Sequence, residues 1–357
     1  MNIIIDIDNI RNNIRLIRKK TKRDIICVVK SNAYGLGARR IVKALLKENV
    51  NYFFFNKLHE YLDVKDLLKN KNVIIFEPLS ISDILKHYEQ NLILTINSLG
   101  DLQRYKSTNK KIRAHIQIDT GMNRFGVRSI NECIKIIENI NDFILLDGIY
   151  THFASNKDEY EYYNTQLDKF KKYLNLYNFN VVHACASSSL HKELIGNMVR
   201  VGIAMYGYAS KLNLNKTCFA YTNVLNILNL EKNTFVGYES KYKTASLEQI
   251  CVLNTGYYDS TLIDKVYFNN REYKFIGKTC MNHAYICTNN EINLQSRLSL
   301  FKKFGIIEEE YDYYKLLTSF NHLPKTYLER NITYEIPYIF KQTSKKSIRC
   351  EPRKRSS

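Results

Sequence analysis

From Asp24 to Tyr206 the sequence alternates short apolar, β-rich runs with amphipathic stretches at a regular interval. This alternation is typical of parallel strands that are joined by helices. The predicted strands are Asp24–Lys30, Tyr52–Asn56, Val73–Glu77, Leu92–Asn97, Ile112–Asp119, Ile144–His152, Val181–Ala186 and Met198–Tyr206. Eight such units in about 190 residues are close to the minimum size of a (β/α)8 barrel of the TIM type, whose active site lies at the carboxyl ends of the strands.

After about Leu212 the pattern changes to Val-, Thr-, Tyr- and Ile-rich runs that are broken by Asn and Gly. These runs predict a C-terminal β-rich domain, with a weaker helical pattern near Glu308–Leu317. The N-terminal run Ile3–Ile7 is expected to add a strand to this domain. The sequence therefore predicts an α/β protein with a barrel at residues 8–212, a β-domain at residues 213–340 together with 1–7, and a basic tail at residues 341–357.

The composition is that of an ordinary globular protein, with 45% hydrophobic and 25% charged residues in 357. No stretch approaches the run of about 18 apolar residues that a membrane span needs. The basic N-terminal residues are interrupted by Asp6 and Asp8, and no apolar signal core follows them, so a cytoplasmic protein is expected. The eight cysteines are scattered without metal-ligand spacing, which predicts reduced thiols and no metal site.

The formal net charge of +18 would suit a nucleic-acid-binding protein. However, the positive charge is spread along a Lys-rich chain, and the one dense basic cluster is Lys341–Arg355. No nucleic-acid recognition motif accompanies that cluster. The sequence therefore does not predict a nucleic-acid partner, and it favours a small-molecule substrate.

Lys30 ends the first predicted strand and precedes the polar, glycine-containing turn 31–37. Burial in an apolar strand mouth lowers the pKa of a lysine, which makes it a candidate for Schiff-base chemistry. A lysine at a strand end is by itself more often a solvated surface residue. The surrounding residues favour the catalytic interpretation, because the segment Val28–Gly37 resembles the pyridoxal-phosphate signature of bacterial alanine racemases.

Four further segments resemble motifs of that family and follow in the same order. They are Asp119–Gly126, Thr151–Ala154, Val199–Gly207 and Gly277–Met281. The resemblance covers roughly residues 2–340. It implies a (β/α)8 barrel followed by a β-domain, pyridoxal 5'-phosphate as cofactor, and a head-to-tail homodimer with active sites shared between subunits. The implied activity is that of an alanine racemase, an isomerase that supplies D-alanine.

The resemblance also implies the catalytic residues. Lys30 would hold the cofactor as an aldimine and act as one of two acid/base groups, while Tyr242 of the partner subunit serves the opposite face of the substrate. His152 would hydrogen-bond both Tyr242 and Arg200, and Arg200 would point at the pyridine nitrogen. Because a guanidinium has only donors, it keeps that nitrogen unprotonated and the electron sink weak.

Phosphate contacts are expected after the last strands of a barrel. The residues that match the family's phosphate contacts are Tyr34, Ser187, Gly202, Ile203 and Tyr334. Gly202 has no side chain, so the backbone N–H groups there can approach the phosphate closely. Tyr334 also matches the residue that narrows the substrate pocket to the size of alanine. Arg124 and Met281 match substrate contacts, and Arg124 suits the carboxylate.

Several positions depart from the family pattern. Gln117 replaces a carbamylated lysine that orients Arg124 in many members, so either chloride or Gln117 itself is expected to hold Arg124. The other departures are Ala186, Thr261, Lys278 and Asn282. Because the last three alter the substrate entrance, a broader-specificity amino-acid racemase is an alternative. A basic, degenerate protein of the same fold without enzymatic activity is another.

Overall fold

The computed structural model describes residues 1–154, 160–208, 211–259, 263–269, 271–288, 290–300 and 332–333. The chain divides into two compact units, one of residues Asp8–Asn215 and one of Met1–Ile7 with Lys216–Ser357. Four predicted features lie outside the described residues: Thr261, the helix near Glu308–Leu317, Tyr334 and the basic tail. In the described ranges, no helix combines the length and apolar character that crossing a bilayer requires.

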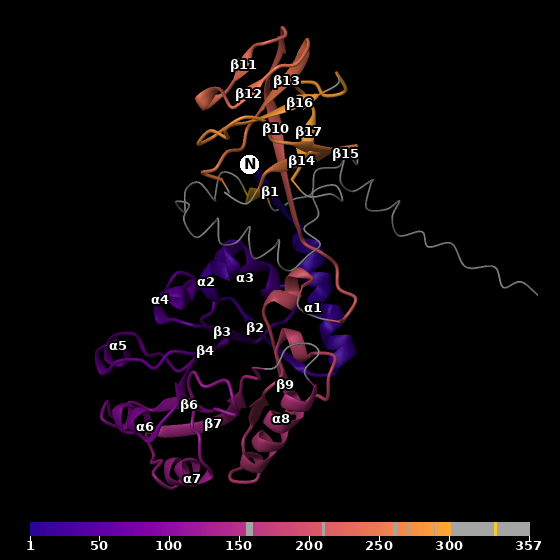
Figure 1. Cartoon of the computed structure of the whole chain (residues 1–357). Helices are drawn as coiled ribbons and strands as arrows, with labels where there is room; N and C mark the ends of the chain where they lie inside the picture. The colour runs from indigo at the N-terminus through magenta and orange to yellow at the C-terminus, as the bar shows by residue number, and fades with distance from the viewer. Residues whose placement is uncertain are drawn as a thin grey trace, which may run out of the picture. The chain divides into compact units, whose positions relative to one another are not determined.

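The first unit is built on a closed barrel of eight parallel strands, which confirms the predicted fold class (Figure 1). The strands are β2 (Asp24–Val28), β3 (Tyr52–Phe55), β4 (Asn72–Ile75), β5 (Leu92–Ile96), β6 (Ile112–Ile118), β7 (Ile144–Thr151), β8 (Val181–His183) and β9 (Met198–Val201). Each strand pairs with the next along the chain, and β9 closes the barrel on β2, where Ile26 lies opposite Arg200.

Helices and 3-10 turns connect the strands (Figure 1). They are α1 (Ile7–Thr21), α2 (Lys30–Tyr34), α3 (Ala38–Leu46), α4 (Leu58–Leu62), η1 (Lys65–Leu67), α5 (Ile81–His87), α6 (Leu99–Lys106), α7 (Ile130–Glu138), α8 (Tyr160–Leu174), η2 (Ser187–Ser189) and η3 (Ile203–Tyr206). Helices α5, α6 and α7 begin after Ser80, Ser98 and Ser129, whose hydroxyls accept a backbone N–H three residues on. Such caps satisfy donors that the first helical turn leaves free.

All eight predicted strands run past the observed carboxyl ends, and three of them lead into short turns. β2 ends at Val28 rather than Lys30, β8 ends at His183 rather than Ala186, and β9 ends at Val201 rather than Tyr206. In each case the chain leaves the sheet to form a tight turn, α2, η2 or η3. The residues of η3 are apolar and buried, so hydropathy alone does not mark the end of β9, whereas α2 and η2 are polar.

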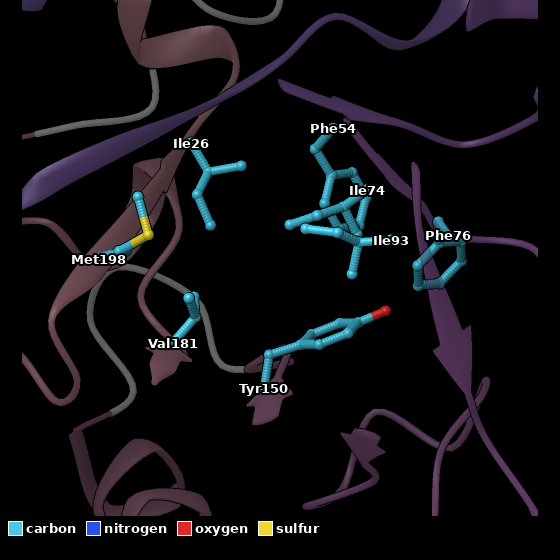
Figure 2. Packing of buried hydrophobic residues seen from close by; sticks show 8 residues of the cluster. All are labelled: Ile26, Phe54, Ile74, Phe76, Ile93, Tyr150, Val181 and Met198. Atoms are coloured by element: carbon cyan, nitrogen blue, oxygen red, sulfur yellow. The ribbon is translucent and has the colours of Figure 1, made fainter. Parts of the chain in front are cut away.

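The barrel interior is a packed core rather than a channel. Figure 2 shows side chains from seven strands, and Phe76 directly after β4, converging on it. They are Ile26, Phe54, Ile74, Phe76, Ile93, Tyr150, Val181 and Met198. The Phe54 ring meets the Tyr150 ring edge-on, with centroids 6.1 Å apart. Because side chains fill the interior, chemistry in this unit is confined to the mouth of the barrel.

The second unit is β-rich and includes the N-terminal strand. β1 (Asn2–Ile5) pairs antiparallel with β10 (Cys218–Leu230) and parallel with β18 (Ile332–Thr333). β1 ends at Ile5 rather than Ile7, because Ile7 begins α1. The other strands are β11 (Phe235–Val236), β12 (Tyr242–Lys243), β13 (Glu248–Leu253), β14 (Lys265–Phe268), β15 (Arg271–Lys274), β16 (Ala284–Thr288) and β17 (Arg297–Ser299), and η4 spans Tyr238–Ser240.

Candidate active site

Lys30 is the first residue of α2, directly beyond the carboxyl end of β2. Its side chain is half-buried, and its Nζ lies 5.8 Å from the centre of the Tyr34 ring. Burial and the nearby charge of Arg124 lower the pKa of the Lys30 ammonium, while Glu60 acts in the opposite direction. A larger fraction of the amine is therefore neutral and nucleophilic than in a solvated lysine.

α2 is a single left-handed turn, in which φ is between 52° and 58° for the four residues 31–34. None of the four is glycine, so the turn is strained and the surroundings must hold it. The Glu60 carboxylate accepts the backbone N–H of Ser31 at 2.7 Å, and its other oxygen accepts those of Asn56 and Lys57. This strained turn sets the direction in which Lys30 enters the barrel mouth.

Arg200, on β9, is the charged group at the centre of the site and is 4% exposed. Its guanidinium donates to the carbonyl oxygens of Thr151 at 2.6 Å, His183 at 2.7 Å and Ala184 at 3.1 Å. It also lies 2.7 Å from His183 Nδ1 and 3.2 Å from His152 Nδ1. Burial lowers the pKa of Arg200 to about 10, which leaves it charged at neutral pH.

The contact with Arg200 determines the tautomer of His152. A guanidinium only donates hydrogen bonds, so His152 Nδ1 is the acceptor and the ring proton sits on Nε2. Burial, together with the charges of Arg200, Arg124 and Lys30, lowers the pKa of His152 to about 3. His152 is therefore a neutral imidazole whose Nε2–H is available as a donor.

Residues after the last two strands form a small cradle of donors. The hydroxyl of Ser187 accepts the backbone N–H of Gly202 at 3.2 Å and that of Ala204 at 3.1 Å, and Ile203 begins η3 between them. A Cβ atom at Gly202 would lie 2.1 Å from the Tyr34 hydroxyl. Only glycine lets that hydroxyl approach the start of η3. Hydroxyl and backbone N–H donors are the groups that fit a phosphate.

Arg124 lies beside the aromatic ring of Phe76, with its guanidinium carbon 4.8 Å from the ring centre. Gln117 makes other contacts: its Nε2 donates to the Phe125 carbonyl at 3.0 Å, and its Oε1 accepts the Tyr150 hydroxyl at 2.9 Å. The expectation that Gln117 itself holds Arg124 is therefore wrong, because both ends of its amide are engaged elsewhere. A cation–π contact with Phe76 holds Arg124 instead.

The β-rich unit contains the other predicted site residues. The Tyr242 hydroxyl donates to Glu248 Oε2 at 2.6 Å, and partial burial together with this contact raises the pKa of Tyr242. Met281 has a half-exposed side chain, and its carbonyl accepts the backbone N–H of Tyr258 at 2.9 Å. Lys278 contacts the carboxylate of Glu239.

The structure thus brings eight of the predicted site residues to the mouth of the barrel unit. They are Lys30, Tyr34, Arg124, His152, Ser187, Arg200, Gly202 and Ile203. Tyr242, Met281, Lys278 and Asn282 belong to the β-rich unit.

Sequence reasoning missed Glu60, Phe76 and His183. His183 lies inside the seventh predicted strand, after its apolar first residues and shortly before Ser187. Its place near a predicted phosphate contact was the signal that could have identified it. No cluster of His, Cys, Asp or Glu suited to a metal occurs within the described part of the chain.

Comparisons with known proteins identify the family. Residues 5–210 match the family described as "Alanine racemase, N-terminal domain", and residues 219–323 match "Alanine racemase, C-terminal domain". The alanine racemase of Fusobacterium nucleatum subsp. nucleatum is 30% identical over 307 residues, covering 81% of this chain and 86% of that protein. The alanine racemase of Methanococcus maripaludis is 28% identical over 330 residues, covering 84% and 88%.

Two solved structures show the same fold. The alanine racemase of Clostridium difficile 630 superposes with a TM-score of 0.79 at 25% identity, covering 91% of this chain and 93% of that one. The alanine racemase from Bartonella henselae, solved with covalently bound pyridoxal phosphate, superposes with a TM-score of 0.76 at 24% identity, covering 89% and 96%.

Proposed function

Since the chain belongs to the alanine racemase family and is a pyridoxal-phosphate-dependent racemase, we propose that it interconverts L- and D-alanine with two bases, Lys30 and Tyr242 of the partner subunit. The observation that carries the proposal is the pairing of buried Arg200 with neutral His152 beside Lys30. When bound, pyridoxal phosphate supplies the electron sink that acidifies the hydrogen on the substrate α-carbon.

The residues at the barrel mouth fit that cofactor. Lys30 has a half-buried amine of lowered pKa, which suits a bond to the cofactor's aldehyde. The hydroxyls of Tyr34 and Ser187 and the backbone around Gly202 suit the phosphate. Arg200 would face the pyridine nitrogen as a donor. A positively charged donor there keeps the nitrogen unprotonated, which favours return of the proton to the α-carbon over side reactions.

Tyr242 is the second base in this proposal, and a homodimer with shared sites follows from it. In its own subunit the phenol bonds Glu248, and this contact helps raise the pKa of Tyr242. In the partner's site the phenol would instead meet the Nε2–H of His152, near the charges of Lys30 and Arg200. Both a donor and nearby cations favour the phenolate. Assembly would therefore turn a poor base into a usable one.

Alanine is the proposed substrate. Arg124 carries a guanidinium at the mouth of the barrel and suits the substrate carboxylate. The altered entrance positions Lys278 and Asn282 keep a broader-specificity amino-acid racemase as the second candidate. A panel of amino acids distinguishes the two, because a broader enzyme would turn over larger side chains with kcat/KM close to that for alanine.

Visible absorbance and racemisation of alanine test the proposal directly. The purified protein is expected to be yellow, and Lys30→Ala is expected to lose both the absorbance and the activity. Lys86→Ala, which removes an exposed lysine on α5, is the matched control and should keep both. An unchanged spectrum in Lys30→Ala, or a wild-type protein that does not racemise alanine, would contradict the proposed function.

A further inference from the structure

We propose that Asp147, His115 and His183 form a buried chain of polar contacts that positions Arg200, and that His115 is a positioning residue of the racemase. The inference rests on the proposed function, because Arg200 matters only if its donors face a cofactor. None of the three residues is among the site residues that the sequence predicted. They come from three neighbouring strands, β6, β7 and β8, and meet inside the barrel.

Two hydrogen-bonding contacts and one longer contact lead from Arg200 to Asp147. Arg200 Nη1 lies 2.7 Å from His183 Nδ1, and His183 Nε2 lies 3.1 Å from His115 Nδ1. His115 Nε2 then lies 3.7 Å from Asp147 Oδ2, which is longer than a hydrogen bond but places the carboxylate opposite that edge of the ring. Within the described residues His115 Nε2 has no hydrogen-bond partner, so its contact with Asp147 is a longer, electrostatic one. Both imidazoles are fully buried.

The direction of every proton in this chain follows from Arg200. Because the guanidinium only donates, His183 Nδ1 accepts and the ring carries its proton on Nε2. That Nε2–H can only donate to His115 Nδ1, which places the proton of His115 on Nε2, facing the Asp147 carboxylate. Burial lowers the pKa of both histidines, so both rings are neutral at neutral pH.

The backbone is shaped to make this chain possible. Pairing of β6 with β7 shifts register between Ala114 and His115, where Ala114 lies opposite Leu146 and His115 lies opposite Gly148. Asp147 is the extra residue of this bulge. A Cβ atom at Gly148 would lie 2.7 Å from His115 Nε2, so glycine provides the space for the ring. Bulges re-aim side chains, and this one presents Asp147 to the ring.

Asp147 is held as an anion by further partners. Arg113 Nη2 donates to Oδ2 at 2.7 Å, and Asn180 Nδ2 donates to Oδ1 at 3.2 Å. The contacts with His115, Arg113 and Asn180 keep the pKa of Asp147 well below its usual range. The series of contacts that begins at Arg200 therefore ends at a negatively charged carboxylate.

Stacking fixes the ring planes. The Tyr150 ring lies parallel to the His183 ring, with centroids 4.6 Å apart and planes 10° apart, and the Arg200 guanidinium lies 5.3 Å from the Tyr150 ring centre. Tyr150 reaches across the barrel interior in Figure 2, and its hydroxyl is held by Thr95 and Gln117. Stacking fixes the plane of the His183 ring, and its hydrogen bonds fix its tautomer. The Arg200 guanidinium can therefore bond His183 in only one orientation.

Two imidazoles between the charges serve a purpose that a direct ion pair would not. A carboxylate against Arg200 would accept its donors and reduce the positive charge that faces the barrel mouth. Asp147 is instead paired with Arg113 and separated from Arg200 by two neutral rings, which leaves Arg200 a full cation. Arg200 would then face the pyridine nitrogen as a full positive charge.

The first test reads the proton positions in the full-length protein as purified, without substrate. Histidine labelled with the heavy nitrogen isotope distinguishes the two neutral tautomers and the cation by nuclear magnetic resonance. Among the eight histidines, His115 and His183 are expected to be neutral and protonated on Nε2. A proton on Nδ1 of His183, or a charged ring at neutral pH, would overturn the proposal.

The second test separates positioning from packing. His115→Leu removes the acceptor for His183, so we expect kcat for alanine to fall about 10-fold while KM stays within about 2-fold. His115→Gln restores an acceptor and a donor, and we expect it to stay within about 3-fold of the wild-type kcat. His87→Leu, at the end of α5, is the control and should change neither. Equal losses in the Leu and Gln variants, or no loss in either, would overturn the proposal.

If His115→Leu does not fold, Asp147→Asn is measured instead. Asparagine removes the negative charge and keeps the volume of the side chain. The nitrogen shifts of His115 are expected to move, and unchanged shifts would overturn the proposal. Failure of the proposed function appears separately, as a wild-type protein that does not racemise alanine. The tautomers are read without turnover, so the two failures are distinguishable.

Discussion

At the scale of single residues, the barrel mouth gathers cations around a neutral imidazole. Arg200, Arg124 and Lys30 each lower the pKa of His152, and Arg124 also lowers that of Lys30. Glu60 is the acid that opposes this effect at Lys30. A pocket with surplus positive charge attracts and retains anions. Two anionic groups, a phosphate on the cofactor and a carboxylate on the substrate, match that surplus.

The two bases should be distinguishable by enantiomer. If Lys30 and Tyr242 serve opposite faces of the α-carbon, Tyr242→Phe should slow proton removal from one enantiomer of alanine by about 10²- to 10⁴-fold and affect the other far less. Single-turnover exchange of the α-hydrogen in deuterium oxide measures each direction separately. Tyr238→Phe, which alters an exposed tyrosine of η4, is the matched control. Small, equal losses for both enantiomers would assign the role to another residue.

At the scale of elements, the left-handed turn α2 depends on one side chain from another element. Glu60, in α4, accepts N–H groups from Ser31, Asn56 and Lys57 with its two oxygens. The same carboxylate therefore ties the turn after β2 to the start of α4. Because four consecutive non-glycine residues have positive φ, the turn is unstable without such support.

Glu60→Gln tests this dependence. The amide keeps only one acceptor oxygen, so we expect the free energy of unfolding to fall by about 1–3 kcal/mol in urea titrations. Loss of the negative charge should also lower the pKa of Lys30 further, since Glu60 raises it. Reactivity of Lys30 with an aldehyde should then begin at lower pH than in the wild-type protein. Glu138→Gln, on an exposed position of α7, should show neither effect.

The elements were predictable from sequence to different degrees. The eight barrel strands appear in the apolar pattern because burial on both faces demands continuous hydrophobic runs. The turn α2 could not be predicted from the sequence. Left-handed φ normally requires glycine, and here tertiary contacts impose it on Ser31 and its neighbours. Phe76 and His183 could not be assigned roles either, since their contacts with Arg124 and Arg200 form only when the strands assemble. The catalytic assignments of Lys30 and Tyr242 stay predictions.

At the scale of the whole molecule, the proposed bases belong to different compact units. Lys30 lies in the barrel unit and Tyr242 in the β-rich unit. In the proposed dimer each site combines Lys30 of one subunit with Tyr242 of the other. Closed two-fold symmetry would then give every homodimer two identical composite sites.

Mixing of inactive variants tests the composite site. Lys30→Ala and Tyr242→Phe homodimers each lack one base in both sites, so both should be inactive or severely impaired. After dissociation and reassembly, a heterodimer has one doubly damaged site and one intact site. We expect it to recover up to about half of the wild-type activity per dimer. Mass-tagged chains verify the exchange, and verified heterodimers without recovered activity would contradict shared sites.

The place of β1 has a consequence for how the protein is made. Its apolar residues Ile3, Ile4 and Ile5 leave the ribosome before the barrel unit does, yet their antiparallel partners Cys218 to Ala220 follow more than 200 residues later. At translation rates of about 5–20 residues per second, the partner strand is synthesised roughly 10–40 s after β1. The barrel unit can fold during this interval, while an unpaired apolar strand remains open to aggregation or to chaperones. The yield of folded protein in a cell should therefore depend on the pace of synthesis as well as on final stability.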